Sequence, residues 1–245
     1  MVGGTGTIGR RIAAALSRDG HESRVLSRSA AQYPVDLITG AGLEAALAGC
    51  EVVVDASNGP PSRKARAVLV EGSRRLLEAE ARAGARHHVC VSIMGIEDVP
   101  MAYYRVKLEQ ERVVESAGVP WTIVRSTQFH GLLAAVLSAA GRRHVLPAPR
   151  ALLQPVDVDE VAAAVTVIAT GAPRLARTTV AGPEVQDLRS LSRIWRAATG
   201  QHAIAIPIPL PGKLGRALRQ GLLTCANPDV RGTQTFAAWL RANAI

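Results

Sequence analysis

The sequence is poor in aromatic side chains and in lysine. Aromatics make up 3% of the 245 residues, and the only lysines are Lys64, Lys107 and Lys213, although the formal net charge is +9. Nucleic-acid binding usually uses a concentrated basic stripe interleaved with aromatic side chains, whereas the arginines here are scattered. The composition therefore disfavours a nucleic-acid partner, and it favours a small anionic ligand such as a dinucleotide phosphate.

Cysteine and long apolar runs are also scarce. Cys50, Cys90 and Cys225 form an odd set without metal-type spacing, so we predict neither a disulfide framework nor a metal site. No apolar stretch reaches the length of a membrane span, and no charged-then-apolar leader precedes the first glycines. We expect a cytoplasmic protein with no membrane partner, and the oligomeric state stays open.

Helical and strand patterns alternate along the chain. The hydrophobic periodicity predicts helices over 10–20, 42–49, 65–84 and 103–118, and strands over 22–29, 51–57, 87–95 and 120–129. This alternation is typical of a Rossmann-type doubly wound parallel sheet in an α/β protein. We predict a dinucleotide-binding domain over 1–130 and a smaller C-terminal α/β substrate lobe over 131–245, with helices over 131–141, 157–171, 187–200 and 235–243.

A glycine-rich loop opens the chain as "GGTGTIG" and runs directly into a helix. Gly3, Gly6 and Gly9 suit a tight turn that lets a phosphate approach the backbone, and Thr7 and Ile8 begin the helix whose free amides would bind it. Only two residues precede the loop, too few for the central strand that such a loop normally follows. We therefore predict a truncated first strand, and hypothesise that the natural start lies upstream or that the chain was trimmed.

The residues that follow the second predicted strand indicate which dinucleotide is preferred. An NAD site usually has a carboxylate there, but this sequence has Arg28 between two serines and no acid. An arginine at this place can pair with a 2′-phosphate, with Arg10 as a possible helper. We predict NADP as the cofactor, with NADPH preferred over NADH.

A further group of polar residues follows the fourth strand. Ser92 ends the strand, and Tyr103 and Lys107 come four residues apart in the next helix, which places them on one helical face. With three tyrosines and three lysines in the chain, chance predicts about 0.04 such Tyr-x-x-x-Lys pairs. Tyr104 is also within one turn of Lys107, so it stays open which of the two tyrosines would act as an acid.

With these residues in place, the sequence resembles the short-chain dehydrogenase/reductase superfamily, specifically its atypical NmrA-like NAD(P)-binding branch. The resemblance covers most of the chain and rests on the glycine loop, Asp36-Leu37, the Ser92, Tyr103 and Lys107 set, and "QPVDVDEVA". It implies hydride transfer in which Tyr103 is the acid/base and Ser92 hydrogen-bonds the substrate carbonyl. It also implies that Lys107 holds the nicotinamide ribose and lowers the pKa of the tyrosine.

The same resemblance implies further ligand contacts. Asp36 and Leu37 would meet the adenine, and the segment "ASNG" from Ala56 to Gly59, which includes Ser57, would run beside the adenosine ribose. Independently of the resemblance, the segment "RSTQFHG" lies at the carboxyl edge of the last predicted strand, where ligands of α/β proteins bind, so the substrate side would include Gln128, Phe129 and His130, with Met94 as a further candidate. His87 and His88 are expected to cap the exposed end of their strand.

Three functions remain open from the sequence. The first is an NAD(P)H-dependent oxidoreductase acting on a carbonyl, quinone or enone of a small organic molecule. The second is a non-catalytic dinucleotide-binding redox sensor or regulator, because many NmrA-like proteins bind the cofactor without known chemistry. The third is a nucleotide-sugar epimerase with tightly held NAD, against which Arg28 and the missing acid count. The substrate itself does not follow from the sequence.

Overall fold

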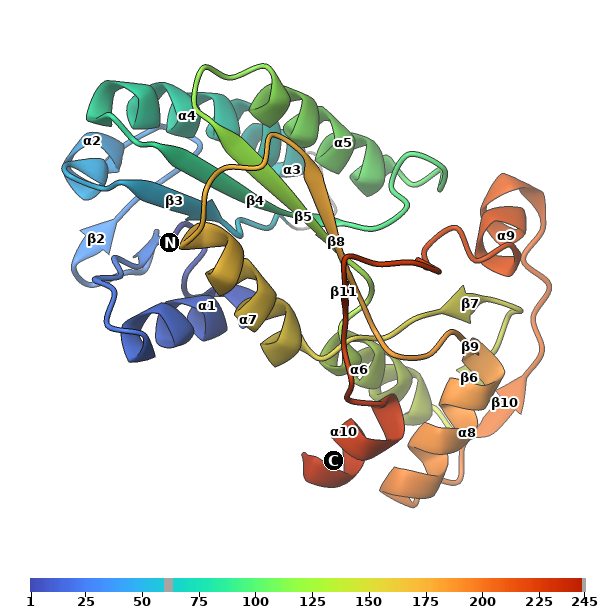
Figure 1. Ribbon diagram of the computed structural model, residues 1–245. Helices are drawn as coiled ribbons and strands as arrows, with labels where there is room; N and C mark the ends of the chain where they lie inside the picture. The colour runs from blue at the N-terminus through green and yellow to red at the C-terminus, as the bar shows by residue number, and fades with distance from the viewer. Residues whose placement is uncertain (60–63, 244–245) are drawn as a thin grey trace. The chain divides into compact units, whose positions relative to one another are not determined.

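The computed structural model describes residues 1–59 and 64–243, and it alternates strands with helices (Figure 1). The strands are β1 (Leu26–Ser27), β2 (Tyr33–Pro34), β3 (Val52–Asp55), β4 (His87–Ile93), β5 (Trp121–Ser126), β6 (Val145–Pro147), β7 (Leu152–Leu153), β8 (Arg177–Ala181), β9 (Gln186–Asp187), β10 (Ile204–Ile206) and β11 (Val230–Arg231). The helical segments are α1 (Thr7–Arg18), α2 (Leu43–Leu47), α3 (Lys64–Arg66), the π-helical η1 (Ala67–Glu71), α4 (Gly72–Ala83), α5 (Ala102–Glu115), α6 (His130–Gly141), α7 (Val158–Ala169), α8 (Leu188–Thr199), α9 (Gly212–Arg219) and α10 (Phe236–Ala242).

The chain forms two compact units that interleave along the sequence. Unit 1 comprises Met1–Ser92, Ala102–Arg125 and Val161–Thr178, and unit 2 comprises Ile93–Met101, Ser126–Glu160 and the chain from Thr179 onward. Strands β4, β5 and β8 each pass from one unit into the other. The division at residue 130 therefore stays a prediction about function rather than a description of these units.

The parallel sheet of unit 1 has the Rossmann order. Strands β8, β5, β4 and β3 lie side by side, with Asp55 of β3 opposite Cys90 of β4. Val2 bridges Leu26 of β1 on one side and Asp55 on the other, and its N–H donates to the carbonyl of Val54 at 2.9 Å. The first strand is thus present as a single paired residue in the central place, and the predicted Rossmann-type sheet with a shortened first strand is confirmed.

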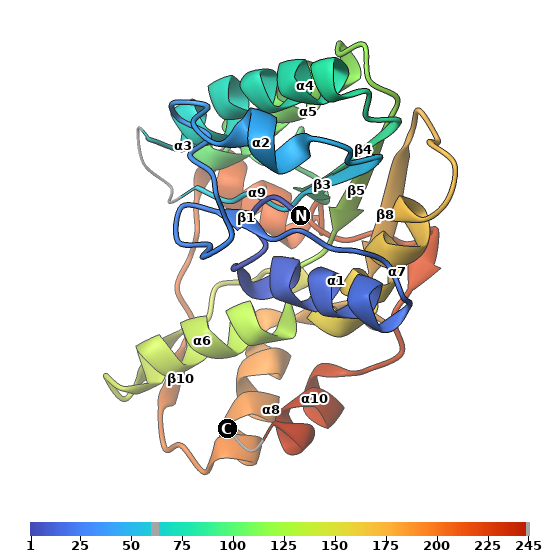
Figure 2. The ribbon, with the colours of Figure 1, turned by 90° about the vertical axis from the view of Figure 1, so that its left-hand side faces the viewer.

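Helices cover both faces of this sheet. In Figures 1 and 2, α2, α4 and α5 lie on one face and α1 and α7 on the other. Leu76 of α4 and Val114 of α5 are fully buried on the first face, because their apolar side chains recur at helical spacing. The predicted helix over 65–84 is found as α3, η1 and α4, so its middle turn is π-helical.

Helix α5 is fixed to the sheet by a buried ion pair. The guanidinium of Arg125 on β5 donates two hydrogen bonds to Glu111, with Nε–Oε1 at 3.0 Å and Nη2–Oε2 at 2.6 Å. A bidentate contact of this kind fixes the relative orientation of the two side chains as well as the distance between them. The helix that carries Tyr103 and Lys107 is therefore held in one orientation against β5.

Unit 2 is built around a separate apolar core. Leu137 of α6, Leu146 of β6, Trp195 of α8 and Phe236 of α10 pack together there. β10 pairs in parallel with β6, and β11 adds to β8. The predicted second-half helices are all found. No helix within residues 1–59 and 64–243 has the length and apolar character needed to cross a bilayer.

Candidate functional site

The glycine loop is shaped by two close backbone approaches. Gly3 has φ +67°, and a Cβ atom built on it would lie 2.7 Å from the carbonyl oxygen of Ala56. A Cβ atom on Gly9 would lie 2.3 Å from the carbonyl oxygen of Gly3. Both contacts are too short for any side chain, so the loop can form only with glycine at these positions.

The amino end of α1 is open to an anion. The helix begins at Thr7 with Gly6 as its N-cap, so no side chain accepts from the first-turn amides, and the first turn carries no acidic residue. Ile8 is buried and anchors the turn, while Thr7 is exposed. Unsatisfied amides and the helix dipole together favour a phosphate at this place.

Two buried hydroxyl groups beside this loop lack partners. Ser57 follows β3 and Ser92 lies in β4, and the Oγ atoms of both are buried without a hydrogen-bond partner among the described residues. Buried hydroxyls normally find a partner, so each is suited to an oxygen or nitrogen of a ligand. The glycine cradle, the uncapped helix and these hydroxyls all lie in unit 1, and together they fit a dinucleotide.

Lys107 lies beneath the carboxyl end of β4. Its side chain is only 3% exposed, and Nζ donates to the carbonyl of Val91 at 2.8 Å and to Oε1 of Gln110 at 2.6 Å. Val91 directly precedes Ser92, so the structure brings the predicted lysine and serine to neighbouring positions. The fold thereby supports grouping these two residues.

Tyr103 has a partner that the sequence did not suggest. Its hydroxyl donates to Oδ1 of Asn58, in the loop after β3. Burial, and to a lesser degree the neighbouring Tyr104, raises the pKa of Tyr103 to about 12. Tyr103 is therefore a protonated hydrogen-bond donor in this arrangement, in which burial rather than Lys107 determines the pKa of the phenol. The role of Lys107 that the resemblance implied stays a prediction.

The remaining cofactor candidates of unit 1 lie in loops. Arg28 is exposed directly after β1. The carboxylate of Asp36 accepts from the backbone N–H of Ile38 at 2.8 Å and so shapes its own turn, and Leu37 is buried in the core. Ala56 is half-buried and lies against Gly3. Their contacts to a ligand stay predictions.

The four substrate-side candidates belong to unit 2, where two of them are engaged in packing. Gln128 donates to the carbonyl of Leu223 at 2.9 Å and accepts from the N–H of Gln154 at 3.1 Å. The ring of His130 is buried beside the Trp239 ring, with Nε2 at 3.0 Å from the carbonyl of Gln234, and burial lowers its pKa.

The other two substrate-side candidates are less constrained. Phe129 is the N-cap of α6 and is half-buried. Met94 is also half-buried, and its backbone N–H donates to the carbonyl of Ser126 at 2.9 Å. Their proposed contact with substrate stays a prediction.

The expectation for His87 and His88 is wrong. Both side chains are almost completely buried rather than placed at an exposed strand end, because helix α4 and strand β5 cover them. His87 Nε2 lies 2.9 Å from Oγ1 of Thr122, and His88 Nδ1 lies 2.9 Å from Glu80. Each imidazole therefore has a structural partner that is distant in sequence.

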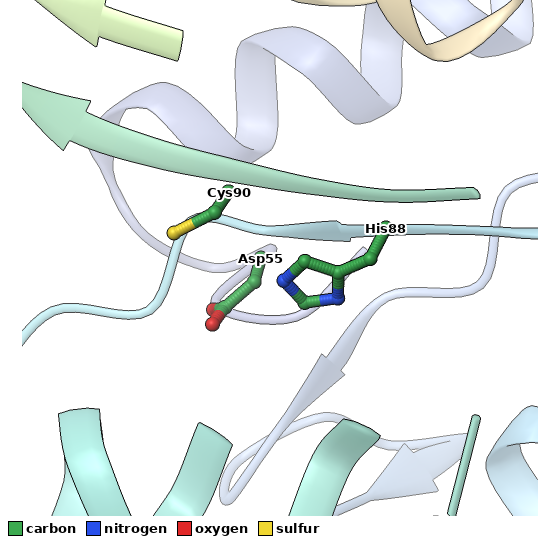
Figure 3. Close-up of side chains that lie close together, drawn as sticks. All are labelled: Asp55, His88 and Cys90. Atoms are coloured by element: carbon green, nitrogen blue, oxygen red, sulfur yellow. The ribbon is translucent and has the colours of Figure 1, made fainter. Parts of the chain in front are cut away.

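His88 also meets two other potential metal ligands. Figure 3 shows Asp55, His88 and Cys90 gathered on neighbouring strands, with their ligand atoms within 4.8 Å of one another. Burial lowers the pKa of His88, but Glu80 and Cys90 together outweigh it and hold the pKa well above its ordinary value, while burial raises the pKa of Glu80. Nδ1 of His88 is bonded to Glu80, so the cluster is part of a buried hydrogen-bond network.

Comparison with known proteins gives one family, a related reductase and solved structures of the same fold. Residues 3–170 match the family model described as NAD(P)H-binding. A (4-alkanoyl-5-oxo-2,5-dihydrofuran-3-yl)methyl phosphate reductase from Streptomyces griseus is 32% identical over 216 residues, covering 79% of this chain and 72% of the relative.

Two solved structures share the fold over nearly the whole chain. An NADPH-dependent quinone oxidoreductase from Escherichia coli, complexed with NADPH, has a TM-score of 0.81 at 17% identity, with 99% and 98% of the two chains covered. A short-chain dehydrogenase/reductase superfamily protein from Agrobacterium tumefaciens with bound NAD has a TM-score of 0.78 at 19% identity, with 99% and 94% covered. At these identities the structures show the fold alone.

Proposed function

The chain belongs to the NAD(P)H-binding family, and from this membership we propose that it is an NADPH-dependent reductase of a small organic molecule carrying a carbonyl, quinone or enone group. The observation that carries the proposal is the Ser92 hydroxyl, which is buried without a partner among residues 1–59 and 64–243 and follows Val91, whose carbonyl accepts from Lys107. The Streptomyces griseus relative, named as reductase of an oxodihydrofuran methyl phosphate, supports a substrate of this kind.

Each protein group has a distinct task in this reaction. The bound dinucleotide supplies the hydride. Ser92 donates a hydrogen bond to the substrate oxygen, Tyr103 delivers the proton that this oxygen gains, and Lys107 would fix the ribose. Carbon receives the hydride and oxygen receives the proton, so a carbonyl becomes an alcohol. To act in this way, Tyr103 must first leave Asn58.

Arg28 supports NADPH rather than NADH within this proposal. It is exposed at the end of β1, and its guanidinium has no hydrogen-bond partner among the described residues, so it is available to pair with a 2′-phosphate. The glycine loop and the amides of α1 would hold the pyrophosphate, and Ser57 the adenosine ribose.

The decisive test combines binding and turnover. We expect NADPH and NADP to raise the melting temperature of the protein more than NADH and NAD do, since a ligand of the folded state stabilises according to its concentration over its Kd. Tyr103→Phe is expected to lower kcat by at least about 100-fold and to leave the NADPH Kd within about threefold of the parent value. A fully active Tyr103→Phe enzyme would remove Tyr103 from the mechanism.

A dinucleotide sensor is the second candidate, and one observation favours it. Tyr103 is hydrogen-bonded to Asn58 and has a pKa of about 12, which makes it a weak acid at neutral pH. A sensor predicts NADPH binding without NADPH oxidation across a panel of aldehydes, ketones, quinones and enones. Oxidation with any of them that Tyr103→Phe abolishes would rule the sensor out.

A further inference from the structure

Lys107 is a buried cation whose neighbours determine its position. Two of the three N–H groups of its ammonium are used, one by the carbonyl of Val91 and one by Oε1 of Gln110. The third has no acceptor within the part of the chain that the structure describes. A buried ammonium with one free donor is suited to an oxygen from a ligand or from a neighbouring side chain that moves.

The amide of Gln110 can be oriented in only one way. An ammonium only donates and a carboxylate only accepts, so Oε1 must face Lys107 and Nε2 must face Asp55. Nε2 lies 3.1 Å from Oδ2 of Asp55 and 3.0 Å from Oγ of Ser73, and Gln110 is completely buried. Every polar atom of this side chain is therefore bonded within one network.

Asp55 connects this network to the loop that follows β3. Its Oδ1 accepts from the backbone N–H of Ser57 at 2.8 Å, which orders the residues beside the glycine loop. The negative charge of Asp55 compensates the positive charge of Lys107 through the amide of Gln110, so the two charged groups are not in direct contact. A direct lysine–aspartate pair would draw the ammonium away from Val91.

We propose that Gln110 is a positioning residue: by bridging Asp55 and Lys107, it fixes two N–H groups of the lysine and keeps the third for the cofactor. This inference rests on the proposed function, and it adds a residue that lies outside the Ser92, Tyr103 and Lys107 set. It assigns a task to the amide of Gln110, which a purely apolar side chain of the same length would not perform.

The test compares isosteric variants by NADPH fluorescence titration. Gln110→Met keeps the side-chain length but removes all three hydrogen bonds, and we expect the NADPH Kd to rise at least about tenfold, the usual effect of losing a hydrogen bond to a charged group. Lys107→Met should raise it similarly. The double variant Gln110→Met/Lys107→Met should bind NADPH no more weakly than Lys107→Met does, because the two changes remove the same interaction.

Two further variants separate positioning from packing. Ser73→Ala removes a partner of Asp55 and Gln110 without touching Lys107, so the melting temperature should fall while the NADPH Kd stays within about twofold. Gln110→Glu retains an acceptor for Lys107 and should bind NADPH more tightly than Gln110→Met does. It also keeps the proposal testable if Gln110→Met fails to fold.

The outcomes distinguish this inference from the proposed function. A parent protein that binds no NADPH refutes the proposed function. A parent protein that binds NADPH, together with a Gln110→Met variant of equal affinity, refutes the positioning role alone. Additive losses in the double variant, or equal affinities for Gln110→Glu and Gln110→Met, would also overturn it.

Discussion

Three candidate residues of unit 1 differ from Gln128 of unit 2 in how much hydrogen-bonding capacity remains. Ser57 and Ser92 have buried hydroxyls without partners among the described residues, and Lys107 has one N–H group without an acceptor there. Gln128, in contrast, uses both ends of its amide to hold Leu223 and Gln154. Ser57, Ser92 and Gln128 are all polar residues near strand ends, so residue type and position did not distinguish them. Remaining capacity does distinguish them, and it supports our proposal of ligand contacts for the two serines and a structural role for Gln128. Nδ1 of His130, also in unit 2, is likewise buried without a partner among the described residues.

Unit 1 also contains buried polar groups that are paired with each other, and breaking such a pair should give the largest effect. His88→Leu leaves the buried carboxylate of Glu80 without its partner, which typically costs about 3–5 kcal/mol. Urea unfolding followed by circular dichroism measures this loss. In the double variant His88→Leu/Glu80→Leu much of the stability should return, because no buried charge is then left alone. An unchanged midpoint for His88→Leu would contradict the ion pair.

The same pair predicts a pH dependence. The folded pKa of His88 lies well above its ordinary value of 6.5, so above pH 6.5 the folded protein retains a proton that the unfolded chain releases. The stabilisation from this proton is fully present below pH 6.5 and falls as the pH rises through the folded pKa. The effect should disappear in the His88→Leu/Glu80→Leu variant.

The proposed ligand binding by unit 1 is tested most directly at Gly9 of the glycine loop. Gly9→Ala places a Cβ atom 2.3 Å from the Gly3 carbonyl oxygen, so the loop must open and NADPH affinity should fall by about 100-fold or more. The melting-temperature shift caused by NADPH measures the loss. Gly118→Ala is the matched control, since a Cβ atom there meets nothing within 4 Å. An undiminished shift in Gly9→Ala would exclude this loop as the binding site.

The structural side of the comparison is tested at Gln128. Gln128→Leu leaves the carbonyl of Leu223 and the N–H of Gln154 without a partner, at a cost of about 1–3 kcal/mol. The NADPH Kd should stay the same, and the exposed Gln201→Leu variant should change neither quantity. Full stability combined with a raised KM for an organic substrate would return Gln128 to the substrate side.

Arg28 gives the smallest expected effect and sharpens the assignment of the cofactor. Arg28→Ser should raise the NADPH Kd by about tenfold and leave the NADH Kd unchanged, because only NADPH carries the 2′-phosphate. Arg18→Ser, which changes an exposed arginine of α1, is the control for net charge. An equal loss for both dinucleotides would assign Arg28 to general electrostatic attraction.

Local patterns explain which predictions succeeded. The alternating periodicities predicted the Rossmann-type fold, and the resemblance carried by the glycine loop and the later motifs implied the family and the oxidoreductase type; these predictions are confirmed. Tyr103 and Lys107 share one helix as predicted, because four residues make about one turn. The partners of these side chains were missed, since Asn58 lies 45 residues from Tyr103 and Asp55 lies 55 residues from Gln110.

The sequence by itself determined the order of helices and strands, the glycine turn and the candidate lysine, because each depends on spacing within a few residues. Only the tertiary structure decided which polar groups are committed. His88 is hydrogen-bonded to Glu80, Lys107 donates to Gln110, and the Ser92 hydroxyl has no partner in the part of the chain that the structure describes. Burial forces polar groups to pair, and the pairing depends on which strands and helices meet across the sheet, which periodicity does not encode.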